Sequence, residues 1–398
     1  MNPPSVIAPP PKRAIREVPF GVNAMRLTLG QWAGVVVLVF LALVFTPRIW
    51  RAVERFDTGP DYRIPYALSQ DYWLYERWLG QNADAGKIMV VGDSVVWGEY
   101  VRPDGTLPHF LNREAGQTNR FVNLGMNGLF PLALEGLETY YGNGLRHEKV
   151  LLHCNLLWMS SPKADLQAAK EEKINHSRLI PQFTPRIPCY RADANERLAA
   201  VVERNLGLVS WVNHIQQAYF ESKSILNWTL QDDGADPPQY PNSYLNPLAR
   251  IKLEVPVAPG NDPMRGPSSP RHVPWFKNSA NPSQFEWVEL DTSLQWQAFK
   301  RLAGLLRDRG NDLFIILGPF NENLVAEESR PAYRKLHDGA AAWFARNKLS
   351  YWAPEPLPSA LYADGSHPLT AGYEQLAKQA FQNAAFQAWL KAGTKDKP

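Results

Sequence analysis

The longest apolar run of the chain lies near its N-terminus. Residues 27–47 (LTLGQWAGVVVLVFLALVFTP) contain no charged side chain, and Arg26 and Arg48 border them. At a rise of 1.5 Å per residue, a helix of about 20 residues crosses a hydrocarbon core of about 30 Å. Trp32 and Trp50 stand near the two ends, where indole rings favour the lipid–water interface. The pattern therefore predicts a transmembrane helix.

A cleaved signal peptide is the alternative for this run. No small-x-small cleavage site follows it, because residues 44–47 read VFTP, so we favour an uncleaved signal anchor. Basic residues flank the run on both sides, and the positive-inside rule does not choose between the two orientations. The proline-rich segment 1–25 cannot nucleate a helix early, and it is predicted to be a disordered cytoplasmic tail.

Three short apolar runs in the rest of the chain have the pattern of buried strands. The first, 87–92 (KIMVVG), is rich in β-branched residues and ends in glycine, and similar runs occupy 149–154 (KVLLHC) and 312–318 (DLFIILG). Strands buried on both faces of a parallel sheet are continuously apolar in this way. These runs therefore predict neighbouring strands of one parallel sheet.

Helical spacing of apolar residues occurs in several other segments. We predict helices over 71–81, 292–309, 332–349 and 370–392, and Thr370 is expected to cap the last of them. The first helix belongs to a predicted neck, 48–86, which joins the anchor to the domain that follows. Strands that alternate with helices indicate an α/β fold in which helices cover both faces of a parallel sheet, a three-layer, flavodoxin-like arrangement. The domain is placed at 87–398.

Residues 161–290 interrupt this alternation and are predicted to be an insertion. A helical pattern covers 192–222, whereas proline is so frequent over 231–290 that regular structure is not expected there. Two interpretations stay open. The insertion is either a lid, or a substrate or partner surface, over the carboxyl edge of the sheet, or it is a linker.

Charge and cysteine content narrow the function classes. The chain has 42 Lys and Arg against 39 Asp and Glu, and a net charge of +3 is too small an excess to indicate binding to nucleic acid. Cys154 and Cys189 are too few for a disulfide framework. We expect no bridge between them, because Cys154 ends an apolar run, where a thiol behaves as a small buried hydrophobic group.

Ser94 and a C-terminal Asp–His pair are the candidate catalytic residues. In VVGDSVVWGEY, Ser94 stands between a predicted strand and a helix, at the sheet edge where open α/β folds bind ligands. A serine hydroxyl needs a histidine base that a carboxylate orients. ALYADGSHPLTAGY supplies both as Asp364 and His367, three residues apart on one loop. Taken alone, Ser94 also fits a helix cap, and Asp-x-x-His is a common surface pattern.

Four blocks in this order resemble the SGNH/GDSL hydrolase superfamily. The first is Gly-Asp-Ser at 92–94, the second NLGMNG at 123–128, the third HCNL at 153–156, and the fourth runs from Asp364 to His367. The third block departs from the family's Gly-x-Asn-Asp, with His153 and Leu156 at its first and last positions. The resemblance covers 87–160 and 310–392.

The resemblance implies a Ser-His-Asp mechanism that uses neither cofactor nor metal. Ser94 would attack an acyl carbonyl, while the amide of Gly125 and the side chain of Asn155 would help to stabilise the oxyanion. After the third strand, Asn321 and Asn323 are candidates for substrate contact, although capping of their loop fits them slightly better. We interpret His153 as a structural histidine, since it alternates with Cys154 across a strand.

A single N-terminal anchor before such a domain is similar to envelope proteins that work beside membrane-bound O-acyltransferases, as in alginate acetylation and teichoic acid D-alanylation. That similarity implies a single-pass protein of the inner membrane whose domain faces the periplasm. Its substrate would be an acyl ester, most simply acetyl, of a surface polysaccharide, and a membrane-bound O-acyltransferase is an implied partner. Hydrolysis and transfer both stay open. The alternatives are a lipid or lysophospholipid esterase and a catalytically weak accessory or binding protein of an acylation complex.

Overall fold

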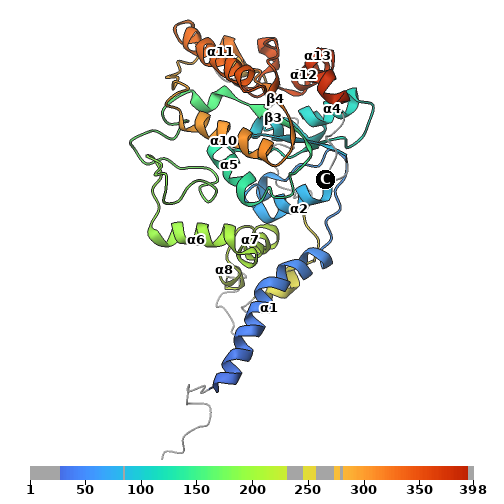
Figure 1. Ribbon diagram of the computed structural model, residues 1–398, viewed down its shortest axis with the longest axis vertical. Helices are drawn as coiled ribbons and strands as arrows, with labels where there is room; N and C mark the ends of the chain where they lie inside the picture. The colour runs from blue at the N-terminus through green and yellow to red at the C-terminus, as the bar shows by residue number, and fades with distance from the viewer. Residues whose placement is uncertain (1–26, 84–85, 231–244, 257–272, 278–280, 393–398) are drawn as a thin grey trace, which may run out of the picture. The chain divides into compact units, whose positions relative to one another are not determined.

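The computed structural model describes residues 27–83, 86–230, 245–256, 273–277 and 281–392 (Figure 1). The predicted tail, 1–25, lies outside these residues. The chain divides into two compact units, 1–46 and 47–398. The second unit carries the sheet and all the candidate catalytic residues.

The helices and strands of the described residues alternate along the second unit. In chain order they are α1 (Leu29–Val53), η1 (Tyr66–Leu68), α2 (Tyr72–Asn82), β1 (Ile88–Val91), α3 (Ser94–Trp97), η2 (Pro103–Gly105), α4 (Leu107–Glu114), β2 (Phe121–Asn123), α5 (Pro131–Tyr140), β3 (Lys149–Cys154), η3 (Leu156–Met159), α6 (Ala194–Asn205), α7 (Gly207–Phe220), α8 (Ile225–Thr229), α9 (Pro247–Arg250), η5 (Trp275–Lys277), α10 (Leu294–Asp308), β4 (Asp312–Leu317), η6 (Glu322–Leu324), η7 (Glu327–Ser329), α11 (Arg330–Arg346), β5 (Ser350–Trp352), η8 (Ser359–Leu361), α12 (Thr370–Gln382) and α13 (Ala384–Lys391).

Helix α1 is, among the described residues, the one helix long and apolar enough to cross a membrane. Its mean hydropathy reaches 2.2, and the protein buries none of that apolar stretch. Exposed apolar side chains all along a helix are typical of a lipid-facing span and not of a helix in a soluble core. The helix is longer than the predicted 27–47, because it continues through Pro47 to Val53.

The five strands form one parallel sheet in the order β2-β1-β3-β4-β5. This is the flavodoxin-like doubly wound order. The predictions for β1, β3 and β4 are confirmed to within one residue at each end, and the α/β parallel architecture is confirmed with them. The outer strands β2 and β5 were not predicted from the sequence.

Side chains alternate between the two faces of the sheet, and both faces are buried. Val150 and Leu152 of β3 join the core that contains residues of α5, α10 and α11, whereas Leu151 between them joins the core beside α4, α12 and α13. The helices lie on the two sides of the sheet in Figure 1. Burial on both faces explains why the central strands are continuously apolar in sequence.

Two helical predictions are corrected by the structure. The segment 370–392 is not one helix, because α12 ends at Gln382 and Asn383 caps α13 by accepting the amide of Phe386. Thr370 is the first residue of α12 and not its cap, a position that Leu369 occupies.

The predicted helical pattern at 192–222 divides into α6 and α7 at Leu206. Among the described residues of 231–290, regular structure is limited to the short α9 and η5. The last part of the insertion returns to the core, where Ser283 forms a parallel bridge with Val325 and the amide of Val288 donates to the carbonyl of Met159. Cys154 and Cys189 are free, and both are buried, although burial was predicted only for Cys154.

Candidate active site

The carboxyl edge of the sheet collects the predicted site residues. Ser94 follows β1, Asn155 follows β3, and the loop with Asp364 and His367 follows β5. The chain reverses its direction of travel across the sheet between β1 and β3, and doubly wound sheets bind ligands at such a switch point. Ser94 and Asn155 therefore flank the crevice that this topology creates.

Ser94 is the first residue of the short helix α3. Asp93 caps that helix, since its Oδ1 accepts the amide of Val95 at 2.9 Å. Gly92 is required just before it, because a Cβ at this position would lie 2.5 Å from the Val96 side chain and 3.0 Å from that of His153. The Ser94 side chain is buried, and the turn that holds it requires glycine at position 92.

The turn that follows Ser94 is fastened by a buried arginine. Arg63 donates to the carbonyls of Trp97 and Gly98 at 2.7 and 2.5 Å, and its guanidinium lies 3.9 Å from the Trp97 ring centroid. From the other side, the Tyr373 hydroxyl donates to the carbonyl of Val95 at 2.7 Å. These bonds fix the short helix that positions Ser94.

The Asp364–His367 loop is built around one carboxylate. Asp364 Oδ1 accepts the amides of Ser366 and His367, both at 2.9 Å, and the His367 ring nitrogen Nδ1 lies 2.8 Å from Oδ2. Burial acts to raise the pKa of Asp364, but the charge and hydrogen bonds of His367 and these amides outweigh it and lower the pKa. Asp364 is therefore an ionised carboxylate that orients the imidazole.

Ser94, His367 and Asp364 form a continuous hydrogen-bonded chain. His367 Nε2 lies 2.8 Å from Ser94 Oγ, on the side of the ring opposite the Asp364 contact. Burial acts to lower the pKa of His367, but Asp364 first, then Glu99 and Asp93, raise it to about 9. The neutral form needed for a general base therefore becomes dominant only as the pH rises through about 9.

Two residues beside His367 were missed in the sequence. Glu99 Oε2 lies 3.5 Å from His367 Nε2, and the Tyr100 ring packs edge-on against the imidazole with centroids 5.2 Å apart. Both follow Gly98, whose φ of +89° turns the chain back towards the site. In the sequence, Gly98 was the only hint that the chain turns back here to bring Glu99 and Tyr100 to His367. A glycine that permits a left-handed turn is not specific to any function.

The predicted oxyanion donor Gly125 lies against the helix of the nucleophile. A Cβ at Gly125 would lie 2.3 Å from the backbone nitrogen of Trp97, so only glycine allows this approach. Its amide donates to Asn123 Oδ1 at 3.0 Å. In this state the single N–H of Gly125 is engaged within the protein.

Asn155, the other predicted donor, is bound to Asp93. Its Nδ2 donates to Asp93 Oδ2 at 2.9 Å, and its Oδ1 accepts the amide of Leu157 at 3.0 Å. The indole nitrogen of Trp158 donates to the same Asp93 oxygen at 3.0 Å. The Asn155 side chain is thus fixed in orientation, and the second hydrogen of Nδ2 is not used by these bonds.

His153, which replaces the family's glycine, is a structural partner of Asp93. Its Nε2 lies 3.1 Å from the carbonyl oxygen of Gly318, and its Nδ1 lies 3.3 Å from Asp93 Oδ1 without the alignment of a hydrogen bond. Burial acts to raise the pKa of Asp93, but His153 and Asn155 help to lower it to about 2. A charged carboxylate therefore lies directly behind the nucleophile.

The two asparagines after β4 differ in their surroundings. Asn321 is buried, donates to the carbonyl of Asp364 at 3.4 Å, and accepts the Ser359 hydroxyl at 3.1 Å. It braces the loop of Asp364, although its side chain makes no capping hydrogen bond to the turn η6 that follows it. Asn323 is exposed at the same sheet edge.

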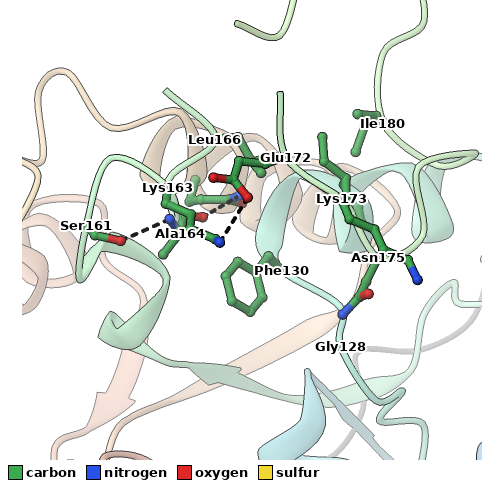
Figure 2. A pocket seen from close by; sticks show the side chains of 13 residues that line it. Gly128, Phe130, Ser161, Lys163, Ala164, Leu166, Glu172, Lys173, Asn175 and Ile180 are labelled. Carbon is green, nitrogen blue, oxygen red and sulfur yellow. Dashed lines mark hydrogen bonds and ion pairs between the residues drawn. The ribbon is translucent and has the colours of Figure 1, made fainter. Parts of the chain in front are cut away.

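A cavity of about 290 Å³ is lined by the loops that follow β2 and β3 (Figure 2). Phe130 lies on one wall, and Lys163 pairs with Glu172 at 2.9 Å across from Lys173 and Asn175. The first part of the predicted insertion supplies these four polar side chains. This part of the insertion therefore forms a wall of the cavity.

Within the described residues, no group of three or more His, Cys, Asp or Glu side chains is arranged to hold a metal ion. Comparison with known proteins gave no relative for this chain, because no protein-family model and no curated protein matches it. The assignment of its function therefore depends on the motifs and on the geometry of the site.

Proposed function

We propose that the protein is a membrane-anchored serine esterase or O-acyltransferase that acts on acyl esters of cell-envelope polysaccharide. The observation that carries the proposal is the chain of short contacts from Ser94 Oγ to His367 Nε2 and from Nδ1 to Asp364, at 2.8 Å each. Three residue types in this connectivity are the arrangement that activates a serine hydroxyl.

The reaction follows from the positions of these atoms. Ser94 Oγ forms a bond to the acyl carbon while His367 Nε2 takes the hydroxyl proton, and Asp364 stabilises the imidazolium. The tetrahedral adduct then loses the alcohol, which leaves with the proton from His367. Water or a sugar hydroxyl attacks the acyl-Ser94 ester and gives its proton to His367. The second adduct then releases the acid or the new ester, while His367 returns the proton to Ser94 Oγ.

The anchor supports the envelope setting. Helix α1 has the length and hydropathy of a single span, and a domain that follows such a helix works close to a membrane. The cavity of about 290 Å³ does not add support, because Ser94, His367 and Asp364 do not line it. The periplasmic side and a membrane-bound O-acyltransferase partner are parts of the same proposal.

The engaged amide of Gly125 favours one second candidate, an accessory protein with little turnover. Gly125 donates its single N–H to Asn123, so a tetrahedral adduct meets one predicted donor that already has a partner. Such a protein would bind an acylated glycan or an acyltransferase and leave the chemistry to its partner.

Covalent labelling separates the two candidates. The full-length chain in detergent would be treated with a fluorophosphonate probe and with p-nitrophenyl acetate, next to Ser94→Ala and to Ser350→Ala, which changes an exposed serine at the start of β5. An esterase or transferase is labelled and active in the wild type and in Ser350→Ala but not in Ser94→Ala. Labelling that is absent or independent of Ser94 contradicts the enzyme proposal.

The acyl acceptor and chain length are then measured directly. Incubation with acetylated and unacetylated glycans, followed by mass spectrometry, detects loss of acetyl to water or its gain by a sugar. Turnover that rises steeply with acyl length from acetyl to long-chain p-nitrophenyl esters would instead support a lipid esterase.

A further inference from the structure

A third apolar cluster of the second unit lies apart from the two cores of the sheet. Ile215, Tyr219 and Phe220 of α7 are its buried members. Trp211 and Ala218 of the same helix pack against them, and so do four side chains from other segments, namely Trp50, Ile225, Trp228 and Ile251. The Trp50 ring contacts the rings of Trp211 and Tyr219 edge-on, with centroids 5.4 and 6.4 Å apart. The last turns of α1 are therefore fastened to α7.

Exposed leucines gather on the segments that border this cluster. Leu226 and Leu230 on and after α8 are 66% and 54% exposed, and Leu248 on α9 is 75% exposed. Leu253, which follows α9, is also exposed. Single exposed apolar residues are ordinary, but several on adjoining short segments mark an interaction surface.

The same segments carry basic side chains. Lys223 precedes α8, Arg250 ends α9, and Lys252 follows it, and all three are exposed. Arg250 is held in place, since its Nε donates to the carbonyl of Tyr219 at 2.9 Å and Nη2 pairs with Glu221 at 2.7 Å. Leucines interspersed with lysine and arginine are typical of surfaces that lie in the headgroup region of a bilayer.

Chain connectivity relates this surface to the membrane. Residues 47–53 belong to the second unit and directly continue the apolar helix. The strand-like segment after α9 pairs with the chain that leaves α1, because the Arg55 amide donates to Leu253 at 2.9 Å and the Val255 amide donates to Arg55 at 3.0 Å. Where a span ends near residue 47, the eight residues from there to Arg55 rise by about 12 Å, so the segment bonded to Arg55 begins within about two helical turns of the hydrocarbon edge.

We propose that α8, α9 and their flanks form a second membrane contact. The surface is defined by Leu226, Leu230, Leu248 and Leu253 with Lys223, Arg250 and Lys252. It inserts its leucines among the headgroups of the bilayer that α1 anchors in, and its basic side chains favour anionic lipid. The proposal rests on α1 as a membrane span, and it gives the domain a second attachment that restricts its tilt over the lipid surface.

Site-directed fluorescence in the full-length chain tests the contact. Both native cysteines are buried, so a thiol-reactive nitrobenzoxadiazole dye would react selectively with Leu226→Cys or Leu248→Cys. Ala342→Cys, on an exposed position of α11, is the control outside the surface, and Val36→Cys reports on the span itself. The proteins would be reconstituted into vesicles of phosphatidylcholine alone or with an equal part of phosphatidylglycerol.

The proposal expects emission from positions 226 and 248 at shorter wavelength than from 342, together with quenching by lipids that carry a nitroxide near the headgroup. Quenching should be stronger in the vesicles with phosphatidylglycerol; equal quenching in both overturns the preference for anionic lipid. If 226 and 248 behave like 342 while 36 is quenched by deep nitroxides, the second contact is refuted and the anchor stands.

Two further outcomes also refute the contact. A shift to shorter wavelength without quenching shows that protein covers these leucines, and an unquenched label at 36 removes the span on which the proposal rests. An unchanged melting temperature of every variant checks that the fold is retained. None of these fluorescence readouts depends on turnover, so failure of the enzyme proposal would leave them interpretable.

Discussion

Glu99→Gln should move the pH dependence of Ser94 reactivity to lower pH. The Glu99 carboxylate lies 3.5 Å from His367 Nε2, where its charge stabilises the imidazolium, and it is among the causes that raise the pKa of His367 to about 9. Glutamine keeps the shape of the side chain and removes the charge. The neutral imidazole, which is the base that Ser94 needs, then forms at lower pH.

The size of the shift follows from distance and exposure. Two unit charges 3.5 Å apart interact by about 1 kcal/mol in water and by about 5 kcal/mol at an effective dielectric constant of about 20. Because the Glu99 side chain is 23% exposed, the lower part of this range applies. At 1.36 kcal/mol per pKa unit, a loss of about 1–2 kcal/mol lowers the pKa of His367 by about one unit.

The assay is the second-order rate of fluorophosphonate labelling between about pH 6 and 10. In the wild type the rate should rise with pH through the pKa of His367, and in Glu99→Gln the midpoint should lie about one unit lower. Glu322→Gln is the matched control, since its carboxylate binds Arg334 at the same sheet edge. An unchanged midpoint, or one that moves to higher pH, would refute the electrostatic role of Glu99.

Three more substitutions test other parts of the structure. Asp364→Asn should slow labelling of a folded protein by about 10³–10⁴-fold, because it removes the carboxylate that fixes the tautomer of the base. Asn155→Ala should slow turnover of p-nitrophenyl acetate by about 10²–10³-fold if its amide serves the oxyanion, whereas full turnover would exclude that role. His214→Ala removes the buried cation that lies 2.6 Å from Asp71 and 3.1 Å from Glu54, and it should lower unfolding stability by about 3–5 kcal/mol. Burial acts to lower the pKa of His214, but these carboxylates raise it to about 9. The contribution of the His214 cation to stability is therefore fully present below about pH 6.5 and is lost as the pH rises through about 9. A melting-temperature deficit of His214→Ala that grows over this pH range would contradict the role of His214 as a stabilising cation.

The central strands could be predicted from the sequence and the outer strands could not. β1, β3 and β4 are covered by helices on both faces, so almost every side chain in them is apolar. β2 and β5 have three residues each, and β5 (SYW) is only half-buried at the edge of the sheet. Three residues with polar members do not form a pattern that distinguishes a strand from a loop.

The hydrogen-bonded chain of Ser94, His367 and Asp364 was predictable because two of its members share one loop. Asp364 and His367 contact each other within three residues, a spacing that is visible in the sequence. Glu99 approaches His367 only after the fold has brought together the loops that follow β1 and β5. The partnership of Asn155 with Asp93 likewise depends on the adjacency of β1 and β3, which no local pattern encodes.

The hydrogen-bond inventory of the oxyanion donors decides which of them is prepared for catalysis. An asparagine Nδ2 carries two hydrogens, so Asn155 can keep its 2.9 Å bond to Asp93 and still donate to a developing oxyanion. The first amide of a helix has no partner within that helix, and Ser94 occupies this position in α3. Gly125 has one hydrogen and already donates it to Asn123 at 3.0 Å, so it must break that bond before it can contribute. Electrostatic stabilisation is greatest when the donors need not reorganise during the reaction. Asn155 and the Ser94 amide should therefore supply most of the oxyanion stabilisation. In the second block, Gly125 is needed first for its close packing against α3, and its contribution to the oxyanion is expected to be the smaller one.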